Sequence, residues 1–428
     1  MYFRAIFFSI MKQRTILDEL KKKQQSQFGR IVVLTGARQT GKTTIARHCF
    51  NDYTYLAVDD VIKSRGFINL TAEQWATIYP QAVLDEIQCE PQLLHSIKAT
   101  YDQFSDTRYV LLGSSQFLLL EKIRESLAGR CVIFEIYPLT FPELLSNDIN
   151  EKIKYSSFFV DFINGNQKKS DILPSFVLDS NYANKKSAYD FYLRFGGYPA
   201  LTNPNLTDME REEWLDMYVR TFLERDIRDL VAFRDLMPFV KLQQYIAHTT
   251  GGLVNFSTIA KETAVSMPTV QRYVRYFSIS YQSITLPAWV ANPLKKLVRA
   301  PKIHFLDTGV LRAVLQKHKS MLTGGEFESA MVAEIYKQIK TYRLPLTCYH
   351  LRTQDGREID LLLEAADYFI AIEIKKSEHI DHRDIAHLKD LQNILTKPIK
   401  HAFVLSNDVE VKHFGENITA MHAAAFLS

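Results

Sequence analysis

Apolar residues occur along the first part of the chain in short runs that alternate with amphipathic stretches. The run RIVVL at residues 30–34 has the pattern of a buried strand, and residues 43–50 open with the spacing of a helix. Further strands are predicted at residues 82–84, 109–112 and 132–136. Strands separated by helical stretches favour a parallel sheet wrapped by helices, because parallel neighbours need long crossover connections. Residues 1–145 are therefore expected to form an α/β domain.

The pattern changes after Pro142. Residues 146–190 are rich in Asn, Ser, Lys and Asp, which predicts an irregular insertion or a lid. A helical pattern follows from Tyr189 to about Phe239 and contains the turn sequence GGYP at residues 196–199. Together these stretches are expected to form a region, residues 146–239, that is part polar insertion and part helical lid.

Two short helices are predicted within residues 240–310. The first covers residues 257–262, and the second begins after Ser266 as MPTVQRYVRYF, with a three-residue turn between them. β-like residues follow at 281–300, and this order is typical of a winged helix-turn-helix. In DNA-binding proteins the second helix enters the major groove, and its candidate contacts here are Thr269, Gln271, Arg272 and Arg275. An interaction module or a lid packed on the first domain explains the same pattern.

Helices and strands alternate again from residue 311 to residue 428. Residues 326–340 have the pattern of a helix, and residues 358–363 and 369–375 have that of strands. No run of about 18 apolar residues occurs anywhere, so no membrane span is expected. The apolar N-terminus MYFRAIFFSI is short and contains Arg4, which argues against a signal peptide.

The composition excludes several classes of protein. Hydrophobic residues make up 46% and charged residues 23% of the 428 residues, so the chain is not collagen-like, mucin-like or disordered, and its length suits about three domains. The four cysteines include no C-x-x-C pair, which argues against a zinc knuckle or a disulfide framework. They are expected to be small buried residues of a reduced compartment, and the protein is expected to be cytoplasmic.

The net charge of +4 is too small to indicate a polyanionic partner. Residues 241–300, however, contain seven basic side chains and one acidic side chain, Glu262. The basic residues are Lys241, Lys261, Arg272, Arg275, Lys295, Lys296 and Arg299. This local excess makes DNA a candidate partner of the predicted winged helix, while a protein partner stays open because charge alone does not identify the ligand.

A phosphate-binding loop is predicted between the first strand and the helix that follows it. The sequence GARQTGKT fits the pattern G-x-x-x-x-G-K-[ST] without a mismatch. Its glycines let consecutive backbone N–H groups surround phosphate oxygens, and the start of the helix adds a favourable dipole. Lys42 is expected to contact the β- and γ-phosphates of ATP, and the Thr43 hydroxyl to bind Mg²⁺. The candidate ATP-binding residues are Gly36, Ala37, Arg38, Gln39, Thr40, Gly41, Lys42, Thr43 and Thr44.

Two adjacent carboxylates, Asp85 and Glu86, end the second predicted strand. In a parallel sheet this position lies at the same edge as the phosphate loop. Asp85 is therefore expected to complete the Mg²⁺ site, and Glu86 to polarise the attacking water as a general base. A solvated strand end is the alternative for an isolated Asp-Glu pair.

Catalytic candidates besides Lys42 and Glu86 come from the next strand and from three arginines. Ser114 follows that strand and could sense the γ-phosphate or orient the water, with a Ser-rich turn as the alternative. Arg130, Arg225 and Arg228 are candidates for a transition-state arginine, in the same chain or toward a neighbouring subunit. Each of them could instead be a salt-bridged helix arginine.

A second constellation of charged residues lies in the C-terminal part. Glu373 and Lys375 share one face of the strand FIAIEIK, and Asp360 lies 13 residues before Glu373, which is enough for a hairpin that brings the carboxylates together. Two carboxylates can hold Mg²⁺, and a lysine beside them can activate water for phosphodiester hydrolysis. An inherited scaffold without activity is the alternative.

Taken in order, the motifs resemble those of prokaryotic AAA-superfamily ATPases that combine an N-terminal P-loop domain with a C-terminal PD-(D/E)XK nuclease-like domain. The resemblance rests on GARQTGKTT, VLDEIQ, GSSQFLL, SLAGR, PLTFPEL and GGYP, and on RDI, KIHFLDTG, RTQDGREID and IEIKKS further along. It covers almost the whole chain and implies that Glu328, Asp360, Glu373 and Lys375 occupy the nuclease positions. Ala264 departs from the pattern, because a glycine is usual in that turn.

The resulting hypothesis is an AAA-type ATPase that uses Mg–ATP to control a DNA- or partner-facing C-terminal half. The alternatives are an ATP-regulated, Mg²⁺-dependent DNA nuclease and a nucleotide switch that only binds, as a regulator or scaffold. The predicted parts are a P-loop domain (1–145), a polar insertion and helical lid (146–239), a winged helix (240–310) and a restriction-endonuclease-like α/β domain (311–428). The sequence leaves ring, dimer and monomer open.

Overall fold

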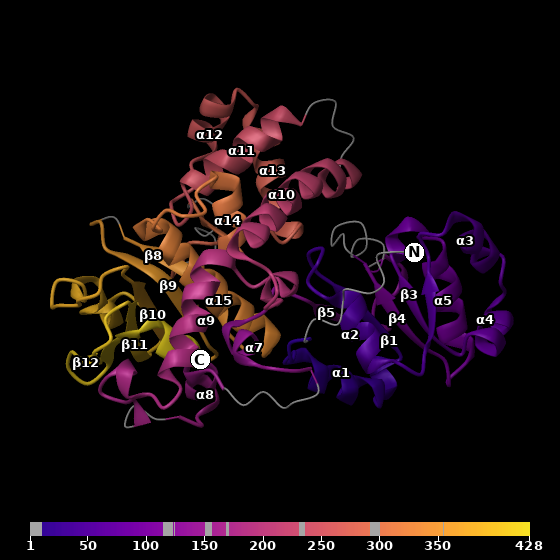
Figure 1. Cartoon of the computed structure of the whole chain (residues 1–428), viewed down its shortest axis with the longest axis horizontal. Coiled ribbons are helices and arrows are strands. Elements are labelled where there is room, and N and C mark those ends of the chain that lie inside the picture. Colours follow the sequence, from indigo (N-terminus) through magenta and orange to yellow (C-terminus); the bar gives the residue numbers. More distant parts are fainter. Residues whose placement is uncertain are drawn as a thin grey trace.

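The computed structural model describes residues 11–113, 123, 125–149, 156–167, 171–230, 236–291, 300–353 and 355–428, apart from the side chains of residues 61–63 and 222–230. Figure 1 shows the N-terminal domain at one end of the longest axis and the C-terminal sheet at the other. Helices α9 (Tyr182–Phe195) and α15 (Gly324–Thr341) lie on the side of the C-terminal sheet that faces the N-terminal domain.

The N-terminal domain is built on a sheet whose described strands are all parallel, in the order β2-β3-β4-β1-β5. The strands are β1 (Ile31–Thr35), β2 (Thr54–Ala57), β3 (Gln81–Asp85), β4 (Arg108–Leu112) and β5 (Cys131–Glu135). The helices are α1 (Ile16–Gln24), α2 (Lys42–Cys49), α3 (Val61–Ile68), α4 (Ala72–Ile78) and α5 (Leu93–Gln103). The predicted parallel α/β domain is confirmed, and β2 is a strand that the hydrophobic pattern missed.

Both faces of this sheet are covered, because successive residues of a strand point to opposite sides. Ile31 and Val33 of β1 belong to a core that includes Trp75 of α4 and Leu93 and Ile97 of α5. The alternate residues of β1, Val32 and Leu34, pack instead with residues of α1 and α2. The two cores hold the C-terminal ends of the strands at a fixed edge of the sheet.

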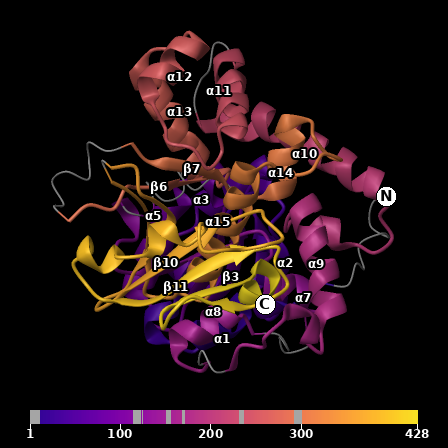
Figure 2. The same ribbon diagram turned by 90° about the vertical axis from the view of Figure 1, so that its left-hand side faces the viewer.

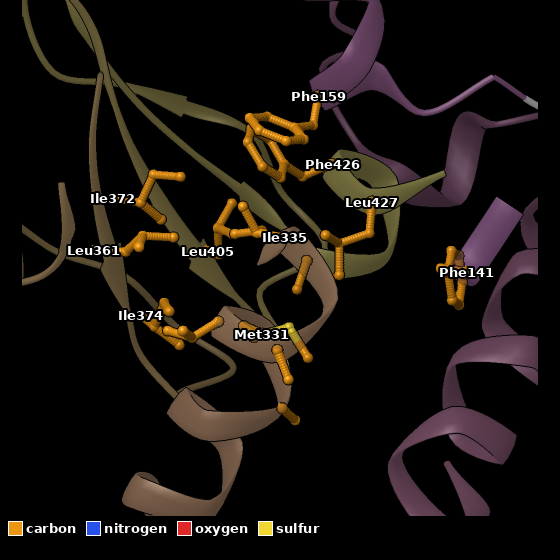
Figure 3. Packing of buried hydrophobic residues seen from close by; sticks show 14 of the residues in the cluster. Phe141, Phe159, Met331, Ile335, Leu361, Ile372, Ile374, Leu405, Phe426 and Leu427 are labelled. Carbon is orange, nitrogen blue, oxygen red and sulfur yellow. The ribbon is translucent and has the colours of Figure 1, made fainter. Parts of the chain in front are cut away.

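The segment predicted as a polar insertion or lid belongs in part to the C-terminal core. It contains α8 (Phe158–Asn164) and the start of α9, after α7 (Phe141–Leu145). Phe159 of α8 is fully buried, and its ring lies 5.4 Å from that of Phe426 near the end of the chain, as Figure 3 shows. Aromatic side chains at helical spacing anchor α8 in this core, and the interpretation of the whole segment as an irregular insertion or a lid stays a prediction.

A helical module and a hairpin follow α10 (Asp208–Leu230). The helices are α11 (Met237–His248), α12 (Phe256–Thr263) and α13 (Met267–Ile279), and the antiparallel hairpin pairs β6 (Ser283–Leu286) with β7 (Lys302–Phe305). Ala264 lies between α12 and α13 with φ of +54°, the left-handed conformation for which glycine is favoured. Helix α14 (Thr308–Leu315) connects this module to the C-terminal domain.

The C-terminal domain is a mixed sheet with α15 on one face. Its described strands have the order β12-β13-β11-β10-β9-β8. They are β8 (Thr347–Arg352), β9 (Glu358–Glu364), β10 (Phe369–Ile374), β11 (Ile399–Ser406), β12 (Lys412–His413) and β13 (Ile418–His422), followed by α16 (Ala423–Leu427). Met331 and Ile335 of α15 pack against Leu361, Ile372 and Leu405 of the sheet, as Figure 3 shows.

The hairpin borders the C-terminal sheet. Ala288, just after β6, forms a parallel bridge with His350 of the edge strand β8, and Trp289 N donates to the His350 carbonyl at 2.7 Å. Thr250, after α11, donates a hydrogen bond of 2.9 Å to Ser329 of α15. In Figure 2, β6 and β7 lie between helices α11–α13 and the sheet. The helical module and the C-terminal domain therefore share one packed border.

The cysteines differ in their exposure to solvent. Cys49, Cys89, Cys131 and Cys348 all fall within the described residues and are free thiols. Cys89 is exposed, so the expectation that all four are buried was wrong. Among the described helices, none combines the length and the apolar character needed to cross a membrane.

Candidate functional site

The loop between β1 and α2 depends on two glycines. Gly36 has φ of +149°, and a Cβ atom there would lie 2.1 Å from the carbonyl oxygen of Ile136. Gly41 has φ of +92° and directly precedes the first residue of α2. A side chain at either position would be strained. The loop can therefore turn tightly from the strand into the helix, so that the N-terminus of α2 faces the edge of the sheet.

Lys42 and Thr43 begin α2 with their polar groups at this edge. The Lys42 ammonium donates to the carbonyl oxygens of Gly36 at 2.9 Å and Ala37 at 2.6 Å. The Thr43 hydroxyl donates to Oδ2 of Asp85, on β3, at 2.9 Å. Two residues that are 42 positions apart in the chain therefore meet with oxygen atoms side by side.

Asp85 is held by more than Thr43. The hydroxyl of Tyr55, on the neighbouring strand β2, donates to the same Oδ2 atom, and the backbone N–H of Glu86 donates to Oδ1 at 3.0 Å. Burial, together with the hydrogen bond to Asp85, raises the pKa of Tyr55 to about 12. The phenol therefore stays protonated and remains a donor near neutral pH.

These oxygens suit Mg²⁺, which prefers hard oxygen ligands and usually keeps several waters. The Thr43 hydroxyl and the Asp85 carboxylate are both partly exposed, so an ion between them could retain water and contact a phosphate. Glu86 follows with φ of +57°, and its carboxylate accepts a hydrogen bond from Gln88. The pair predicted as Mg²⁺ ligands thus lies together, with the predicted general base next to it.

The remaining loop residues have mixed surroundings. Ala37 and Thr40 are buried, and the Thr40 hydroxyl donates to the Ala37 carbonyl at 2.9 Å. Arg38 is partly buried, whereas the side chains of Gln39 and Thr44 are exposed. The buried residues fix the shape of the loop, and the exposed ones are available to a ligand.

Ser114 lies outside the described residues, but the strand before it is placed. Strand β4 lies between β1 and β3, and Gly113 N donates to the Leu34 carbonyl at 3.2 Å. The chain therefore leaves β4 between the phosphate loop and Asp85. The side chains of Arg225 and Arg228, on α10, also lie outside the described residues.

Arg130 does not lie beside the phosphate loop of its own chain. It directly precedes β5, and since β5 runs parallel to β1, this position is at the edge of the sheet opposite the loop. Its guanidinium forms an ion pair with Asp102 at 2.7 Å. The prediction that Arg130 points at a phosphate of the same subunit is thus wrong, because the parallel topology separates the two. Its action on a neighbouring subunit stays a prediction.

The four residues predicted at the nuclease positions come together on α15, β9 and the end of β10. The backbone N–H of Asp360 donates to Glu373 Oε2 at 3.3 Å, and the Lys375 ammonium lies 3.2 Å from Glu373 Oε1. Oδ2 of Asp360 accepts a hydrogen bond of 2.8 Å from the backbone N–H of Ile374. Glu328 approaches from α15 and is joined to Asp360 through a fifth residue.

That fifth residue, Lys302 at the start of β7, was not singled out among the candidate site residues. Its ammonium lies 2.7 Å from Glu358 Oε1, 2.9 Å from Glu328 Oε1 and 3.4 Å from Asp360 Oδ1. Its side chain is only 3% exposed. A signal was present in the sequence, since KIHF begins a buried strand with a charged residue, and such a charge requires a partner.

Glu328, Glu358, Asp360 and Glu373 form what we define as the acidic cluster, and burial and repulsion raise the pKa of two of its members. Burial, with Asp360 nearby, raises the pKa of Glu328 to about 7 and that of Glu373 to about 8. Burial alone would lower the pKa of Lys302, but the charges of Glu328 and Asp360 outweigh it and the pKa is raised. Lys302 therefore stays charged among these carboxylates. Across the part of the chain that the structure describes, no group of three or more His, Cys, Asp or Glu side chains is arranged to hold a metal ion.

The predicted DNA-facing side chains lie on the outer surface of α13. Gln271, Arg272 and Arg275 are exposed, and Thr269 is half-buried with its hydroxyl 2.8 Å from that of Ser266. The basic residues of the connection between β6 and β7, Lys295, Lys296 and Arg299, lie outside the described residues. The described part of the surface thus presents two arginines and a glutamine from a single helix.

Three family models match separate parts of the chain. Residues 29–145 match the model described as an AAA domain. This match supports an AAA-like P-loop ATPase domain in this part of the chain. Residues 186–320 and 323–426 match two domains of unknown function, DUF8612 and DUF4143. The nuclease likeness of the C-terminal part and the winged-helix assignment therefore stay proposals.

Similar proteins extend over most of the chain. An uncharacterized protein of Mycobacterium tuberculosis is 26% identical over 393 residues, which cover 89% of this chain and 79% of the relative. An uncharacterized protein of Haemophilus influenzae is 21% identical over 412 residues, which cover 89% of this chain and 92% of the relative. A Walker-type ATPase of Pyrococcus abyssi is similar in structure with a TM-score of 0.41 and 13% identity, over 71% of this chain and 98% of that one.

Proposed function

We propose that this protein is an ATPase that uses Mg–ATP to control a DNA- or partner-facing C-terminal half. The observation that carries the proposal is the contact between Thr43 and Asp85 beneath the glycine loop. Hydroxyl and carboxylate oxygens at this place suit the Mg²⁺ ion that accompanies ATP. A glycine turn without a function would need neither the strand-end carboxylate of Asp85 nor its three hydrogen-bond donors.

The residues of the loop have distinct roles in this proposal. The backbone N–H groups at the start of α2 bind the phosphates, and Lys42 exchanges its contacts with the Gly36 and Ala37 carbonyls for phosphate oxygens. Thr43 and Asp85 would hold Mg²⁺, which when bound neutralises charge that develops on the phosphates. Glu86 accepts a proton from the attacking water, and Ser114 orients that water. Arg130 serves the site of a neighbouring copy.

Nucleotide binding and hydrolysis are separated by two variants. Lys42→Ala should abolish binding of a fluorescent ATP analogue, whereas Glu86→Gln should keep binding and lose about 100-fold or more of the turnover. Lys22→Ala is the matched control, because Lys22 is a highly exposed lysine on α1 of the same domain. Retention of nucleotide binding by Lys42→Ala would contradict the assignment. Tight binding with no turnover in the unmodified protein would favour a switch that only binds.

The DNA-facing part of the proposal rests on α11–α13 and the hairpin, which we take as a winged helix. The order of three helices and an antiparallel hairpin supports this reading, as does the exposure of Arg272 and Arg275 on α13. Replacing both arginines with glutamate should weaken binding to duplex DNA at least tenfold and reduce its salt dependence, measured by fluorescence anisotropy with and without ATP. Unchanged or absent DNA binding would favour a protein partner for this surface.

The alternative of a Mg²⁺-dependent nuclease is supported by the meeting of Glu328, Asp360, Glu373 and Lys375. It is the weaker candidate because the Lys302 ammonium contacts two of these carboxylates, Glu328 and Asp360. We therefore expect no cleavage of plasmid DNA with Mg²⁺ or Mn²⁺, in the presence or absence of ATP. Cleavage that Asp360→Ala abolishes, with ATP binding intact, would establish the nuclease instead.

A further inference from the structure

The acidic cluster contains a cation that belongs to the chain itself, the ammonium of Lys302. Lys302 begins β7, and its ammonium contacts carboxylates from two elements: Glu328 on α15, and Glu358 and Asp360 on β9. An ammonium has three N–H donors, and the three contacts use one carboxylate oxygen each. The side chain is 3% exposed, so these carboxylates replace nearly all of its hydration.

A divalent ion does not fit this arrangement. Mg²⁺ binds oxygens at about 2.1 Å in an octahedral shell, and an ion held by Glu328 and Asp360 would have to lie in the space that the Lys302 ammonium fills. Two cations at that separation would also repel each other strongly in a buried site. Two of the residues at the nuclease positions, Glu328 and Asp360, therefore share Lys302 as their ligand.

The backbone keeps the lysine in place. Lys302 pairs with Leu286 across the hairpin and also bridges to Leu253, and β7 packs against α15. The Ala300 carbonyl, two residues earlier, lies 3.1 Å from Nε2 of His350 on β8. Withdrawal of the ammonium would require movement of the strand and not merely a change of rotamer.

We propose that Lys302 is the resident cation of the acidic cluster, which replaces a metal ion and ties the hairpin electrostatically to the C-terminal sheet. The cluster then serves as an interdomain joint and takes no divalent ion in this arrangement. This inference is independent of ATP hydrolysis, because it concerns other residues and can be measured without nucleotide.

Mn²⁺ binding tests the proposal directly. The nucleotide-free full-length protein is titrated with MnCl₂, and free Mn²⁺ is followed by electron paramagnetic resonance. The unmodified protein should have no site that Asp360→Asn removes. Lys302→Met should gain one such site, and the double variant with Asp360→Asn should lose it. Lys302→Arg is the matched control, because it keeps a cation in the cluster and should gain no site.

The melting temperature supplies a second readout. Lys302→Met should melt at a lower temperature than the unmodified protein, and Mn²⁺ should raise its melting temperature again. In the unmodified protein, Mn²⁺ should change the melting temperature by the same amount as in the Asp360→Asn variant. An Asp360-dependent Mn²⁺ site in the unmodified protein would overturn the proposal, and so would a folded Lys302→Met variant without a new site. If Lys302→Met does not fold, the comparison of the unmodified protein with Asp360→Asn decides.

Discussion

Two glutamates of one helix show how the role of a buried charge is decided by its partner. Glu328 and Glu334 both lie among apolar residues of α15. Glu328 faces Lys302 in the acidic cluster, whereas Oε1 of Glu334 accepts a hydrogen bond of 2.7 Å from the backbone N–H of Phe141. The sequence pattern is the same for both, because the alternation of apolar and polar residues does not show which residue each glutamate contacts. Only the three-dimensional contacts separate a site residue from a structural one.

Tyr55 offers a test of the Mg²⁺ site at the scale of one hydroxyl. Its OH donates to Asp85, and a hydrogen bond of this kind orients a ligand carboxylate. Tyr55→Phe should therefore raise the Mg²⁺ concentration for half-maximal ATPase activity roughly fivefold, which corresponds to about 1 kcal/mol. Nucleotide affinity without Mg²⁺ should not change. Tyr53→Phe is the control, and an equal effect in both variants would refute an orienting role for Tyr55.

His422 makes the stability of the C-terminal core dependent on pH. It is buried against Phe176, and its Nδ1 accepts from the backbone N–H of Ala424 at 3.1 Å. Burial, with the charge of Lys186 acting in the same direction, lowers its pKa to about 4, although Asp408 opposes the shift. Folding thus favours the neutral ring, and its contribution is complete above pH 6.5 and is lost as the pH falls toward 4. The loss amounts to at most about 3 kcal/mol.

The variant His422→Asn keeps a cap acceptor but does not titrate. Its free energy of unfolding, measured by urea denaturation, should fall less between pH 6.5 and pH 4 than that of the unmodified protein. Other buried histidines contribute equally to both proteins, so the difference isolates His422. Identical slopes would show that another group is responsible.

At the scale of elements, the sequence predicts segments with a continuous apolar pattern well, and it misses segments in which polar residues interrupt that pattern. Each strand predicted in the P-loop domain lies within one residue of the observed strand, because buried parallel strands are continuous apolar runs. Strand β2 was missed because only Leu56 of its four residues is buried. Helix α8 was missed because polar neighbours obscure its aromatic residues. The role of Asp85 could be predicted from its place at the end of a strand. The role of Lys302 could not, because it depends on contacts between elements that are distant in the sequence.

The turn after α9 shows why one element needs a glycine. Gly196 has φ of +75°, and a Cβ atom there would lie 2.0 Å from Asp307 Oδ1. Asp307 caps α14 through Val310 N at 3.1 Å and also accepts from Gly197 N at 2.8 Å. The same carboxylate therefore holds the turn and starts the next helix. A side chain at position 196 would displace both.

Gly196→Ala is accordingly expected to destabilise the protein by about 3 kcal/mol or more, measured by chemical denaturation. Gly165→Ala is a matched control, because Gly165 ends α8 with φ of +76° and has nothing within 4 Å of the added Cβ. It should lose only about 1 kcal/mol, which reflects the left-handed backbone alone. Equal losses would show that the collision with Asp307 is relieved by movement of the turn.

At the scale of the whole molecule, the phosphate loop is connected to the distant sheet. Arg14 donates to the Thr40 carbonyl of the loop at 2.8 Å and to the Tyr137 carbonyl at 2.7 Å. Ala37 of the same loop belongs to the hydrophobic core that contains Phe141 and the C-terminal residues. A change of the loop on nucleotide binding would therefore reach residues 136–140, the linker between β5 and α7. This continuity is a physical route for the proposed control of the C-terminal half by ATP.

Residue Leu139 of this linker is held by Lys337, which forms a buried ion pair with Glu334 on α15. Lys337 is fully buried, lies 2.8 Å from Glu334 Oε2 and donates to the Leu139 carbonyl at 3.0 Å. Removal of one partner leaves a buried charge without compensation. Lys337→Met should therefore lower the free energy of unfolding by about 3 kcal/mol or more, whereas the double variant Lys337→Met with Glu334→Gln should lose less than the sum of the single variants. Lys340→Met, at an exposed position of the same helix, should change it by less than about 0.5 kcal/mol.

The same variants test whether the Lys337–Glu334 ion pair transmits the nucleotide state to the C-terminal sheet. Amide hydrogen exchange of β9 and β10, compared with and without Mg–ATP, should respond to nucleotide in the unmodified protein and in Lys340→Met. The response should be lost in the double variant, because the linker then has no ionic anchor on α15. A response that persists in a folded double variant would show that the signal travels through the hydrophobic core around Ala37 and Phe141 alone.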